Sequence, residues 1–324
     1  MAAAEKLFKK IISKAGHGTD NCIFTEPYPK YSNHRVGSDK TNRPTILIHS
    51  NNPANKQYPN SKRDNLEIMF NKSCKVSSGS TTENCNFTLM TLLTDDDEII
   101  SYFFEITDVL VCKLGNDPSL STVYEEVSKV LTIFEKTKKI SKDGVQGLFC
   151  ELTTINLSTD KDTMVEAWHN ETTDRFDFND SNVKIEVKST KKDKRVHHFK
   201  ASQLNSDNPL YIASFMVIPS GIGKTVLALK DEIEKKLNKT ENKTKLNEIV
   251  LKTLGVNYLS SNEYVFDYNS IIQTLRFYDL KDISVIEESN IPGSYSNLSF
   301  DVDFSNFNYV QTKTKFNLVN TFLN

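Results

Sequence analysis

The chain has 324 residues, of which 38% are hydrophobic and 25% charged, a composition typical of a soluble globular protein rather than a disordered one. Its length suits two or three packed domains. The formal net charge is only −2, so binding to nucleic acid must come from local clusters of basic residues. The five cysteines are scattered and form no CxxC pair, which argues against a zinc site and against a disulfide framework.

The opening stretch, MAAAEKLFKKIISKAG, is basic and carries an apolar stripe of Leu7, Phe8, Ile11 and Ile12. It lacks the apolar segment and cleavage pattern of a secretory signal, so we expect an amphipathic helix that packs on the protein. The longest apolar runs, such as LYIASFMVIP, are too short to cross a bilayer. We therefore expect a cytoplasmic protein that does not interact with membranes.

The first 140 residues are predicted to form an N-terminal α+β region. Residues 17–64 are polar, with short apolar strings between them. After them, short apolar runs predict two strands, and helical spacing of apolar residues predicts two helices. These elements are expected at 65–70, 87–93, 95–114 and 119–139. We assign recognition, dimer or partner contacts to this region.

A second unit is expected from Ser141, where KDGVQGLFCELTTI has the apolar spacing of a helix. Glu151 lies at the edge of that apolar face. Taken alone, it is best interpreted as a surface glutamate with a salt bridge, since an unpaired buried charge is costly. Later segments predict strands around Asp177, at 183–189, at 210–219, in LSFDVDF and in FNYVQTK, with helices over Phe199–Leu204, 226–237, 246–254 and 270–274. The order helix, strand, strand, helix, strand predicts an α/β (α+β) core.

RFDFNDSNVKIEVKST, residues 175–190, contains the candidate chemistry. Alternate residues of a strand face the same side, so Glu186 and Lys188 share one face. Asp177 and Glu186 could supply the oxygen ligands that Mg²⁺ prefers, together with the backbone carbonyl of Val187. Lys188 could orient a water molecule and stabilise charge on a phosphate. Glu151 would hold the metal or an outer water. The spacing alone is weak, because charged strand edges are common.

The order of these motifs resembles the PD-(D/E)XK nuclease superfamily, and more narrowly the prokaryotic "PD-(D/E)XK motif protein" family. The matching segments are GLFCEL, RFDF, IEVKST, SQL and LYIASFMVI. The resemblance runs from about residue 85 to 310 and is most specific between 147 and 218. Cys150 replaces a glycine of the family pattern GLxGEL, and Phe176 stands where the name-giving proline is expected.

By this resemblance, a restriction-endonuclease-like core of a mixed sheet flanked by helices is expected at 141–225, with an extension at 226–324. Asp177, Glu186 and Lys188 would form the site, Glu151 would be an extra carboxylate, and Gln203 would line the entrance. Trp168, in EAWHNE, corresponds to a tryptophan of the family. Asp174 and Asp180 are rival ligands by their proximity in sequence. Members of the family often accompany methyltransferase and ATPase genes of restriction or phage defence.

A basic segment follows the site, with seven Lys or Arg against two acidic residues from Lys184 to Lys200. We interpret it either as a DNA-contacting loop, which positions the phosphate backbone without reading sequence, or as a solvated basic loop. The candidate contacts are Lys191, Lys192, Lys194, Arg195, His197 and His198.

IPSGIGKT, residues 218–225, resembles a phosphate-binding loop but has Ile218 where the motif requires glycine. A β-branched residue disfavours the backbone that wraps phosphates, so an NTPase is the weakest hypothesis. The sequence favours a Mg²⁺-dependent DNA endonuclease of restriction or antiphage defence, with Mn²⁺ as a substitute cation. Expected partners are double-stranded DNA, a second copy of the chain, and ATPase or methyltransferase defence proteins. The alternative is a catalytically silent DNA-binding or scaffolding subunit.

Overall fold

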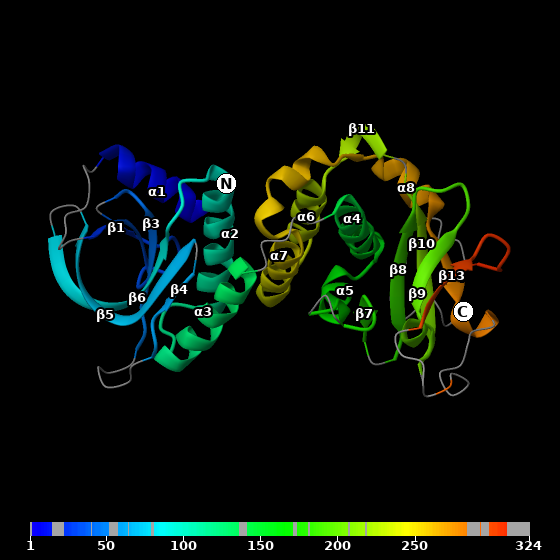
Figure 1. Ribbon diagram of the computed structural model, residues 1–324, viewed down its shortest axis with the longest axis horizontal. Coiled ribbons are helices and arrows are strands. Elements are labelled where there is room, and N and C mark those ends of the chain that lie inside the picture. The colour runs from blue at the N-terminus through cyan, green and yellow to red at the C-terminus, as the bar shows by residue number, and fades with distance from the viewer. Residues whose placement is uncertain are drawn as a thin grey trace. The chain divides into compact units, whose positions relative to one another are not determined.

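The structure is a computed structural model in which two compact units are distinguished (Figure 1). The first consists of Met1–Lys139 with Leu254–Ser260, and the second of Ile140–Thr253 with Ser261–Asn324. The structure describes residues 2–14, 23–39, 41–51, 58–63, 65–78, 81–135, 141–170, 174–180, 182–206, 208–217, 219–283, 292 and 298–309. Residues 226–324, expected as an extension, belong to the same unit as the predicted nuclease core, apart from 254–260.

The first unit is built on a sheet that closes on itself. Its strands are β1 (Ile23–Pro27), β2 (Arg35–Ser38), β3 (Pro44–Ile48), β4 (Ser61–Lys62), β5 (Leu66–Ser78) and β6 (Thr81–Leu92). They follow the order β1-β2-β3-β6-β5-β4, and β1 also pairs in parallel with β5, which closes a ring seen end-on in Figure 1. Closure pairs strand edges that would otherwise be exposed. Four of these strands lie in the segment 17–64, for which no strand was expected.

The interior of this sheet is apolar. A cluster of Leu47, Val76, Phe87 and Leu89 brings together β3, β5 and β6. Along β5, alternate residues such as Leu66 and Ile68 are buried, as expected for a strand with one face in a core. The two strands expected at 65–70 and 87–93 are confirmed within β5 and β6, which are longer than the apolar runs that indicated them.

Three helices complete the first unit: α1 (Ala3–Lys14), α2 (Asp97–Leu114) and α3 (Leu120–Glu135). The expected amphipathic helix is confirmed as α1, with Phe8 and Ile11 buried and Ile12 41% exposed. Asp96 begins α2 by accepting the Glu98 and Ile99 amides, and Gly115 ends it with φ of 68°. Residues 136–139 of the predicted second helix lie outside the described residues.

Asp108 of α2 anchors the start of α1. It accepts the Tyr28 hydroxyl and, through Oδ2, the Ala3 amide at 3.0 Å. The Tyr28 ring is almost fully buried, and burial raises its pKa well above the usual value, with the Asp108 charge as the second cause. This carboxyl group therefore has a structural role, because it satisfies donors at a helix N-terminus.

The second unit contains a mixed four-stranded sheet of order β12-β10-β8-β7. Its strands are β7 (Phe178–Asn179), β8 (Lys184–Thr190), β10 (Leu210–Met216) and β12 (Arg276–Asp279). The central strands β8 and β10 are parallel, and each edge strand is antiparallel to its neighbour. The mixed α/β core expected from the sequence is confirmed, with the apolar run 210–216 inside the sheet.

A separate two-stranded sheet pairs β9 (Val196–Lys200) with β13 (Ser299–Asp303). The predicted helix over Phe199–Leu204 is wrong for its first two residues, because Phe199 and Lys200 lie in β9. Only Ala201–Leu204 is helical, as the short 3₁₀ helix η1. Phe199 is fully buried and packs on Phe304, so contacts with the distant β13 segment override the local helical pattern.

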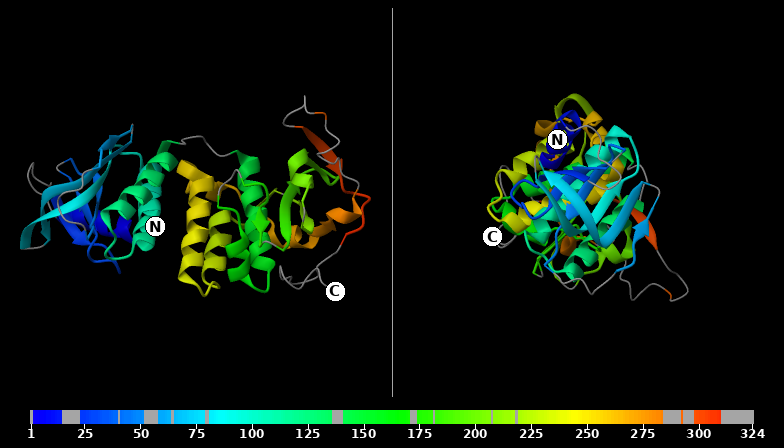
Figure 2. Two further views of the ribbon diagram at one scale, coloured as in Figure 1. Left: turned by 90° about the horizontal axis from the view of Figure 1, so that it is seen from below. Right: turned by 90° about the vertical axis from the view of Figure 1, so that its left-hand side faces the viewer.

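The helices of the second unit are α4 (Lys142–Leu157), α5 (Lys161–Ala167), α6 (Val226–Glu234), α7 (Thr240–Leu254) and α8 (Tyr268–Thr274). Ser141 caps α4 by accepting the Gly144 amide, and the predicted apolar face is buried. α4 packs on β8 and on α6, and α6 and α7 lie side by side (Figure 2). α4 therefore crosses the sheet next to the strand that carries Glu186 and Lys188.

The remaining elements are β11 (Pro219–Lys224) and the 3₁₀ turns η2 (Gly255–Asn257), η3 (Ser260–Glu263) and η4 (Leu280–Asp282). Residues 310–313 of the string FNYVQTK lie outside the described residues. In the described part of the chain, no helix is both long and apolar enough to cross a membrane.

Candidate active site

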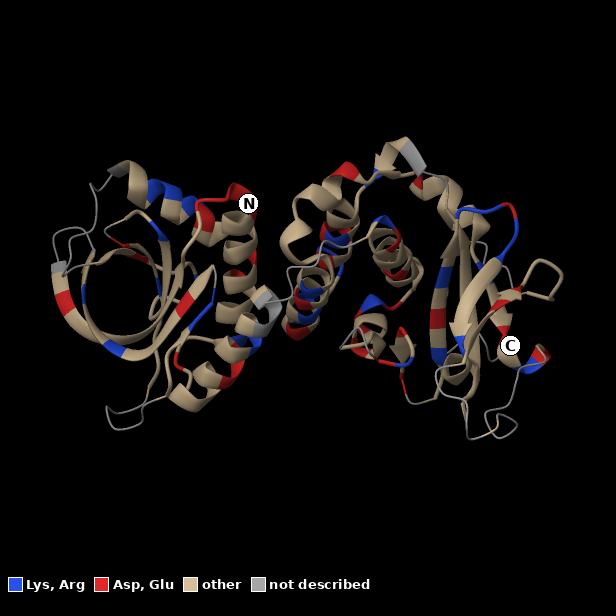
Figure 3. Cartoon of the chain, in the orientation of Figure 1, with Lys and Arg blue, Asp and Glu red and all other residues tan. Residues whose placement is uncertain are grey.

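Charged residues alternate with uncharged ones along β8, which carries blue and red bands in Figure 3. Because alternate residues of a strand share a face, these charged residues lie on one side of β8. Glu186 Oε1 lies 2.7 Å from Lys188 Nζ. The Lys188 ammonium also lies 4.9 Å from the centre of the Phe199 ring, a cation–π contact from β9. The prediction that Glu186 and Lys188 share a face is therefore confirmed, and the lysine is held in place from two sides.

Glu186 is only 2% exposed and is oriented by three groups. Besides Lys188, Gln203 donates from Nε2 to Oε1 at 2.6 Å, and the Asp177 amide also bonds the carboxylate. The Gln203 side chain is fixed in turn by the Lys200 amide, 3.1 Å from its Oε1. Burial raises the pKa of Glu186, although Lys188 opposes the shift. Gln203 thus lies in the site and holds its central carboxylate.

Asp177 directly precedes β7, opposite Glu186 on β8. Its Oδ2 accepts the Val187 amide at 2.6 Å. Burial raises its pKa well above the usual value, and the charges of Glu186 and then Glu151 raise it further. Three carboxyl groups thus converge, an arrangement that disfavours their simultaneous ionisation without a cation.

Glu151 reaches the same place from α4. Its Oε2 accepts Trp168 Nε1–H at 2.7 Å and lies 3.1 Å from His169 Nε2. Trp168 is 1% exposed, forms a β-bridge with Phe178 and lies nearly parallel to its ring. The carboxylate at the edge of the apolar helix face therefore has buried partners, and the surface salt bridge considered from the sequence is not what the structure contains.

His169 is the residue that sequence reasoning missed. Ligand atoms of Glu151, His169 and Asp177 lie within 4.8 Å of one another. Ligands of one divalent ion lie about 2.0–2.2 Å from it, so opposite ligands are at most about 4.4 Å apart and small side-chain movements would complete a site. Two carboxylates and an imidazole therefore fit a divalent cation. The sequence offered only one signal, the adjacency of His169 to Trp168.

The other predicted ligands are placed differently. Val187 contacts Asp177 through its amide, and ligation by its carbonyl stays a prediction. Asp174 accepts the Asn170 amide at 2.9 Å, and Asp180 accepts the Asn182 and Val183 amides in the turn before β8. These bonds give both rival aspartates structural roles in turns.

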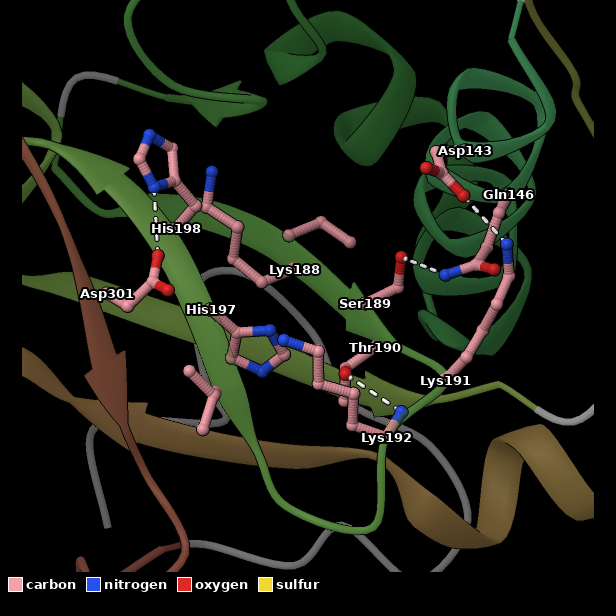
Figure 4. A pocket seen from close by; sticks show the side chains of 12 residues that line it. Asp143, Gln146, Lys188, Ser189, Thr190, Lys191, Lys192, His197, His198 and Asp301 are labelled. Atoms are coloured by element: carbon pink, nitrogen blue, oxygen red, sulfur yellow. Dashed lines mark hydrogen bonds and ion pairs between the residues drawn. The ribbon is translucent and has the colours of Figure 1, made fainter.

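A groove of about 530 Å³ lies beside this cluster. Lys188, Lys191, Lys192 and His198 contribute to its lining, together with residues of α4, β9 and β13. Figure 4 shows Lys191 turned toward Asp143 at one end and His198 paired with Asp301 at the other. Gln146 of α4 donates to Ser189 of β8 at 2.8 Å, and this bond fixes the part of the groove lining formed by α4 and β8. Lys188 thus belongs to both the acidic cluster and the groove.

Two of the predicted DNA contacts are not part of an exposed basic loop. The Arg195 guanidinium is buried and donates to Ser214 and to the Thr274 carbonyl. His197 is 3% exposed and bonds Ser214 Oγ at 2.7 Å, and burial lowers its pKa to about 4. Arg195, directly before β9, and His197, in β9, both contact Ser214 of β10, so neither lies in an exposed loop as expected. His197 nevertheless lines the groove. Lys191, Lys192, Lys194 and His198 are exposed.

Most of the segment that resembles a phosphate-binding loop is the strand β11. Lys224 pairs with both oxygens of Glu232 at 2.7 Å and lies 4.3 Å from the Tyr268 ring centre. Gly223 has φ of 155°, and a Cβ there would lie 1.9 Å from the Phe266 carbonyl oxygen. The glycine thus permits a close approach to Phe266. Ile218 lies outside the described residues.

In a comparison with family models, residues 5–305 match the family DUF4420, described as "Putative PD-(D/E)XK family member". The chain belongs to this family. No match is found among the curated proteins, and none among the solved structures. The match covers parts of both units and begins at residue 5, well before residue 85, where the resemblance seen in the motifs begins. Membership points to a nuclease-like protein, a class that typically uses divalent metals.

Proposed function

We propose that this PD-(D/E)XK family member hydrolyses phosphodiester bonds of double-stranded DNA, with Mg²⁺ as the cation and Mn²⁺ as a substitute. The observation that supports this most is the 2.7 Å contact between Glu186 and Lys188 on one face of β8, beside Asp177. Glu151 approaches from α4 and adds a third carboxylate to this group. Carboxylates that gather around a buried position, next to a fixed ammonium, are suited to a cation and a phosphate together.

In the proposed reaction, water adds to phosphorus, one P–O ester bond breaks, and the leaving oxygen takes up a proton. A bound divalent cation would polarise a phosphate oxygen and lower the pKa of a nearby water molecule. Lys188 would donate a hydrogen bond to the attacking water or to a phosphoryl oxygen, where negative charge increases in the transition state. Gln203 would keep Glu186 in place, and the Val187 amide would do the same for Asp177.

The groove beside the site would take the phosphate backbone. Lys191 and Lys192 are exposed at its rim, and among the described residues no carboxylate pairs with Lys192. Contacts of this kind position a duplex without reading its sequence. Base recognition would then come from other parts of the chain, for which the first unit is our candidate.

We further propose a role in restriction or antiphage defence, alongside ATPase or methyltransferase partners. Cleavage of both strands needs two active sites if each makes one cut, so a homodimer is the simplest assembly. Both proposals rest on the family relationship and on the chemistry of the site.

The test is cleavage of unmodified phage DNA in Mg²⁺ by wild type, Lys188→Ala and Lys184→Ala. Lys184 is the matched control, because it lies on the same face of β8 but bonds Ser206 at 3.1 Å and contacts the Phe176 ring. We expect wild type and Lys184→Ala to cleave and Lys188→Ala to be inactive. Equal cleavage by all three would rule out this site. DNA binding by wild type with neither cleavage nor metal binding in calorimetry would favour the silent DNA-binding subunit.

A further inference from the structure

His169 gives the candidate metal site a donor atom that differs in chemistry from its carboxylates. We propose that His169 is a metal ligand together with Glu151 and Asp177, and that its nitrogen makes the site prefer first-row transition cations, with Mn²⁺ as their probe, over Mg²⁺. The inference rests on the proposed function, because it concerns the cation that the nuclease site binds.

The backbone fixes where His169 lies. Its amide donates to the Asp177 carbonyl at 2.9 Å, and Trp168 just before it bridges Phe178 of β7. The histidine and the aspartate are therefore held on neighbouring backbone segments, while Glu151 approaches from α4. Ligand atoms of these three residues lie within 4.8 Å of one another although they come from three segments of the chain.

Both carboxylates have an oxygen left over for a cation. In the described part of the chain, the bonds to Glu151 all fall on Oε2, and the bond to the Asp177 carboxylate falls on Oδ2. The His169 side chain is 9% exposed, and Nε2 is the ring nitrogen that faces Glu151, so Nε2 would be the metal ligand. Nδ1, which is buried without a hydrogen-bond partner among the described residues, would then carry the ring proton.

The type of donor decides which cations are favoured. Mg²⁺ binds oxygen ligands and keeps several waters, so an imidazole contributes little to its affinity. Imidazole nitrogen suits first-row transition ions, and carboxylates suit Mn²⁺ as well. A site of two carboxylates and one histidine should therefore bind Mn²⁺ more tightly than Mg²⁺, whereas the three carboxylates alone would discriminate less. Mg²⁺ at higher concentration would still support cleavage.

A simpler role for His169 is to position Glu151 through the 3.1 Å contact between Nε2 and Oε2. The two roles predict different results for His169→Gln. Glutamine keeps an N–H donor that can bond a carboxylate, but it has no imidazole nitrogen. A positioning role would therefore survive the substitution in large part, whereas a preference that depends on the nitrogen ligand would not.

The experiment measures Mn²⁺ and Mg²⁺ affinities of the full chain by titration calorimetry, and ¹⁴N coupling to bound Mn²⁺ by pulsed electron paramagnetic resonance. For wild type we expect Mn²⁺ to bind about tenfold or more tightly than Mg²⁺, with ¹⁴N coupling present. His169→Gln should lose about tenfold or more in Mn²⁺ affinity, change little in Mg²⁺ affinity, and lose the coupling. His49→Gln, a histidine of the first unit that contacts Asp117, is the control and should behave as wild type.

A wild-type spectrum without ¹⁴N coupling would overturn the inference without relying on any variant. An unchanged ratio of Mn²⁺ to Mg²⁺ affinity in His169→Gln would do the same. Cleavage separates these failures from those of the proposed function. Mg²⁺-dependent cleavage that requires Lys188, with no coupling, leaves the nuclease and removes the histidine ligand. Coupling and selectivity without cleavage keep the metal site and reject the nuclease.

Discussion

Asp108 in the first unit and Asp177 in the second both have a pKa that burial raises, but their neighbours differ in kind. Asp108 is surrounded by donors, namely the Tyr28 hydroxyl and the amides of Ala3 and Ala4. Asp177 has one amide donor and two other carboxylates nearby. A buried carboxyl group surrounded by donors has a structural role, whereas one surrounded by other carboxyl groups indicates a cation-binding site.

Substituting each of these two aspartates gives the largest expected effects and would test the comparison directly. Asp177→Asn should reduce cleavage by about 100-fold or more, because it removes a charged ligand. It should leave the metal-free protein as stable or more stable, because it removes a desolvated charge beside Glu186 and keeps an acceptor for the Val187 amide. Cleavage assays and thermal unfolding in EDTA measure the two effects.

Asp108→Asn should lower the stability of the protein and leave cleavage unchanged. An amide group cannot accept all the donors that meet the carboxylate, so the start of α1 loses about 1–3 kcal/mol of stability. Hydrogen–deuterium exchange should become faster in α1, while cleavage and metal affinity stay at wild-type values. If both variants lowered stability and neither affected cleavage, the two aspartates would be of the same kind and the comparison would fail.

Trp168→Phe removes the donor that orients Glu151 and keeps a ring that can pack near Phe178. Loss of such an outer-shell bond typically lowers metal affinity by about 10–100-fold. We expect a loss within that range in calorimetric titrations with Mn²⁺, and a fold that is unchanged by circular dichroism. Wild-type affinity would mean that the indole serves packing alone.

Substituting His197 would test whether the buried ionisable groups of the second unit are all functional. Its pKa is lowered to about 4, against about 6.5 in the unfolded chain, so the unfolded state binds more protons between these pH values. Its contribution to stability is complete above pH 6.5 and is lost as pH falls toward 4. The loss between pH 7 and pH 5 is about 2 kcal/mol.

His197→Asn should reduce this pH dependence in urea unfolding followed by the fluorescence of Trp168, the single tryptophan, which lies in the second unit. His198→Asn is the control, since that side chain is exposed. An equal pH dependence in wild type and His197→Asn would show that the pKa of His197 is the same in the folded and unfolded chains.

The smallest expected effect concerns the basic rim of the groove. Lys192→Ala should weaken DNA binding a few-fold at low salt and reduce the slope of log K against log salt by about 1, if the ammonium contacts one phosphate. Lys224→Ala is a matched control, because that lysine is paired with Glu232 instead. Equal salt slopes for both variants would place the DNA elsewhere.

Local patterns accounted for much of the second unit. The helix that carries Glu151 and the strand that carries Glu186 and Lys188 follow from apolar spacing over short windows, and both are confirmed. The expected roles of these residues stay predictions, but their proximity follows from a helix that packs on the neighbouring strand. Here the local preference and the tertiary packing agree.

Features that depend on partners distant in sequence could not be predicted from local patterns. A short apolar run indicated part of β5, but neither β1 nor the pairing of Ile23 with Val76 that closes the sheet was predicted. Phe199 has a helical neighbourhood in sequence and lies in a strand because β13 pairs with it. His169 contacts Glu151 only because the chain returns after α5, a distance of 18 residues. Long-range contacts decide these cases, and sequence spacing does not encode them.

The pairing of β9 with β13 also sets an order of events during synthesis. About a hundred residues separate Lys200 from Ser299, so at roughly 5–20 residues per second a ribosome needs about 5–20 s to supply the partner strand. Until then Asp301 is not present to pair with His198, and Phe304 cannot cover Phe199. A nascent chain that already contains every residue of the acidic cluster would thus still lack one wall of the groove. The assembly of the complete site would therefore be delayed until late in translation.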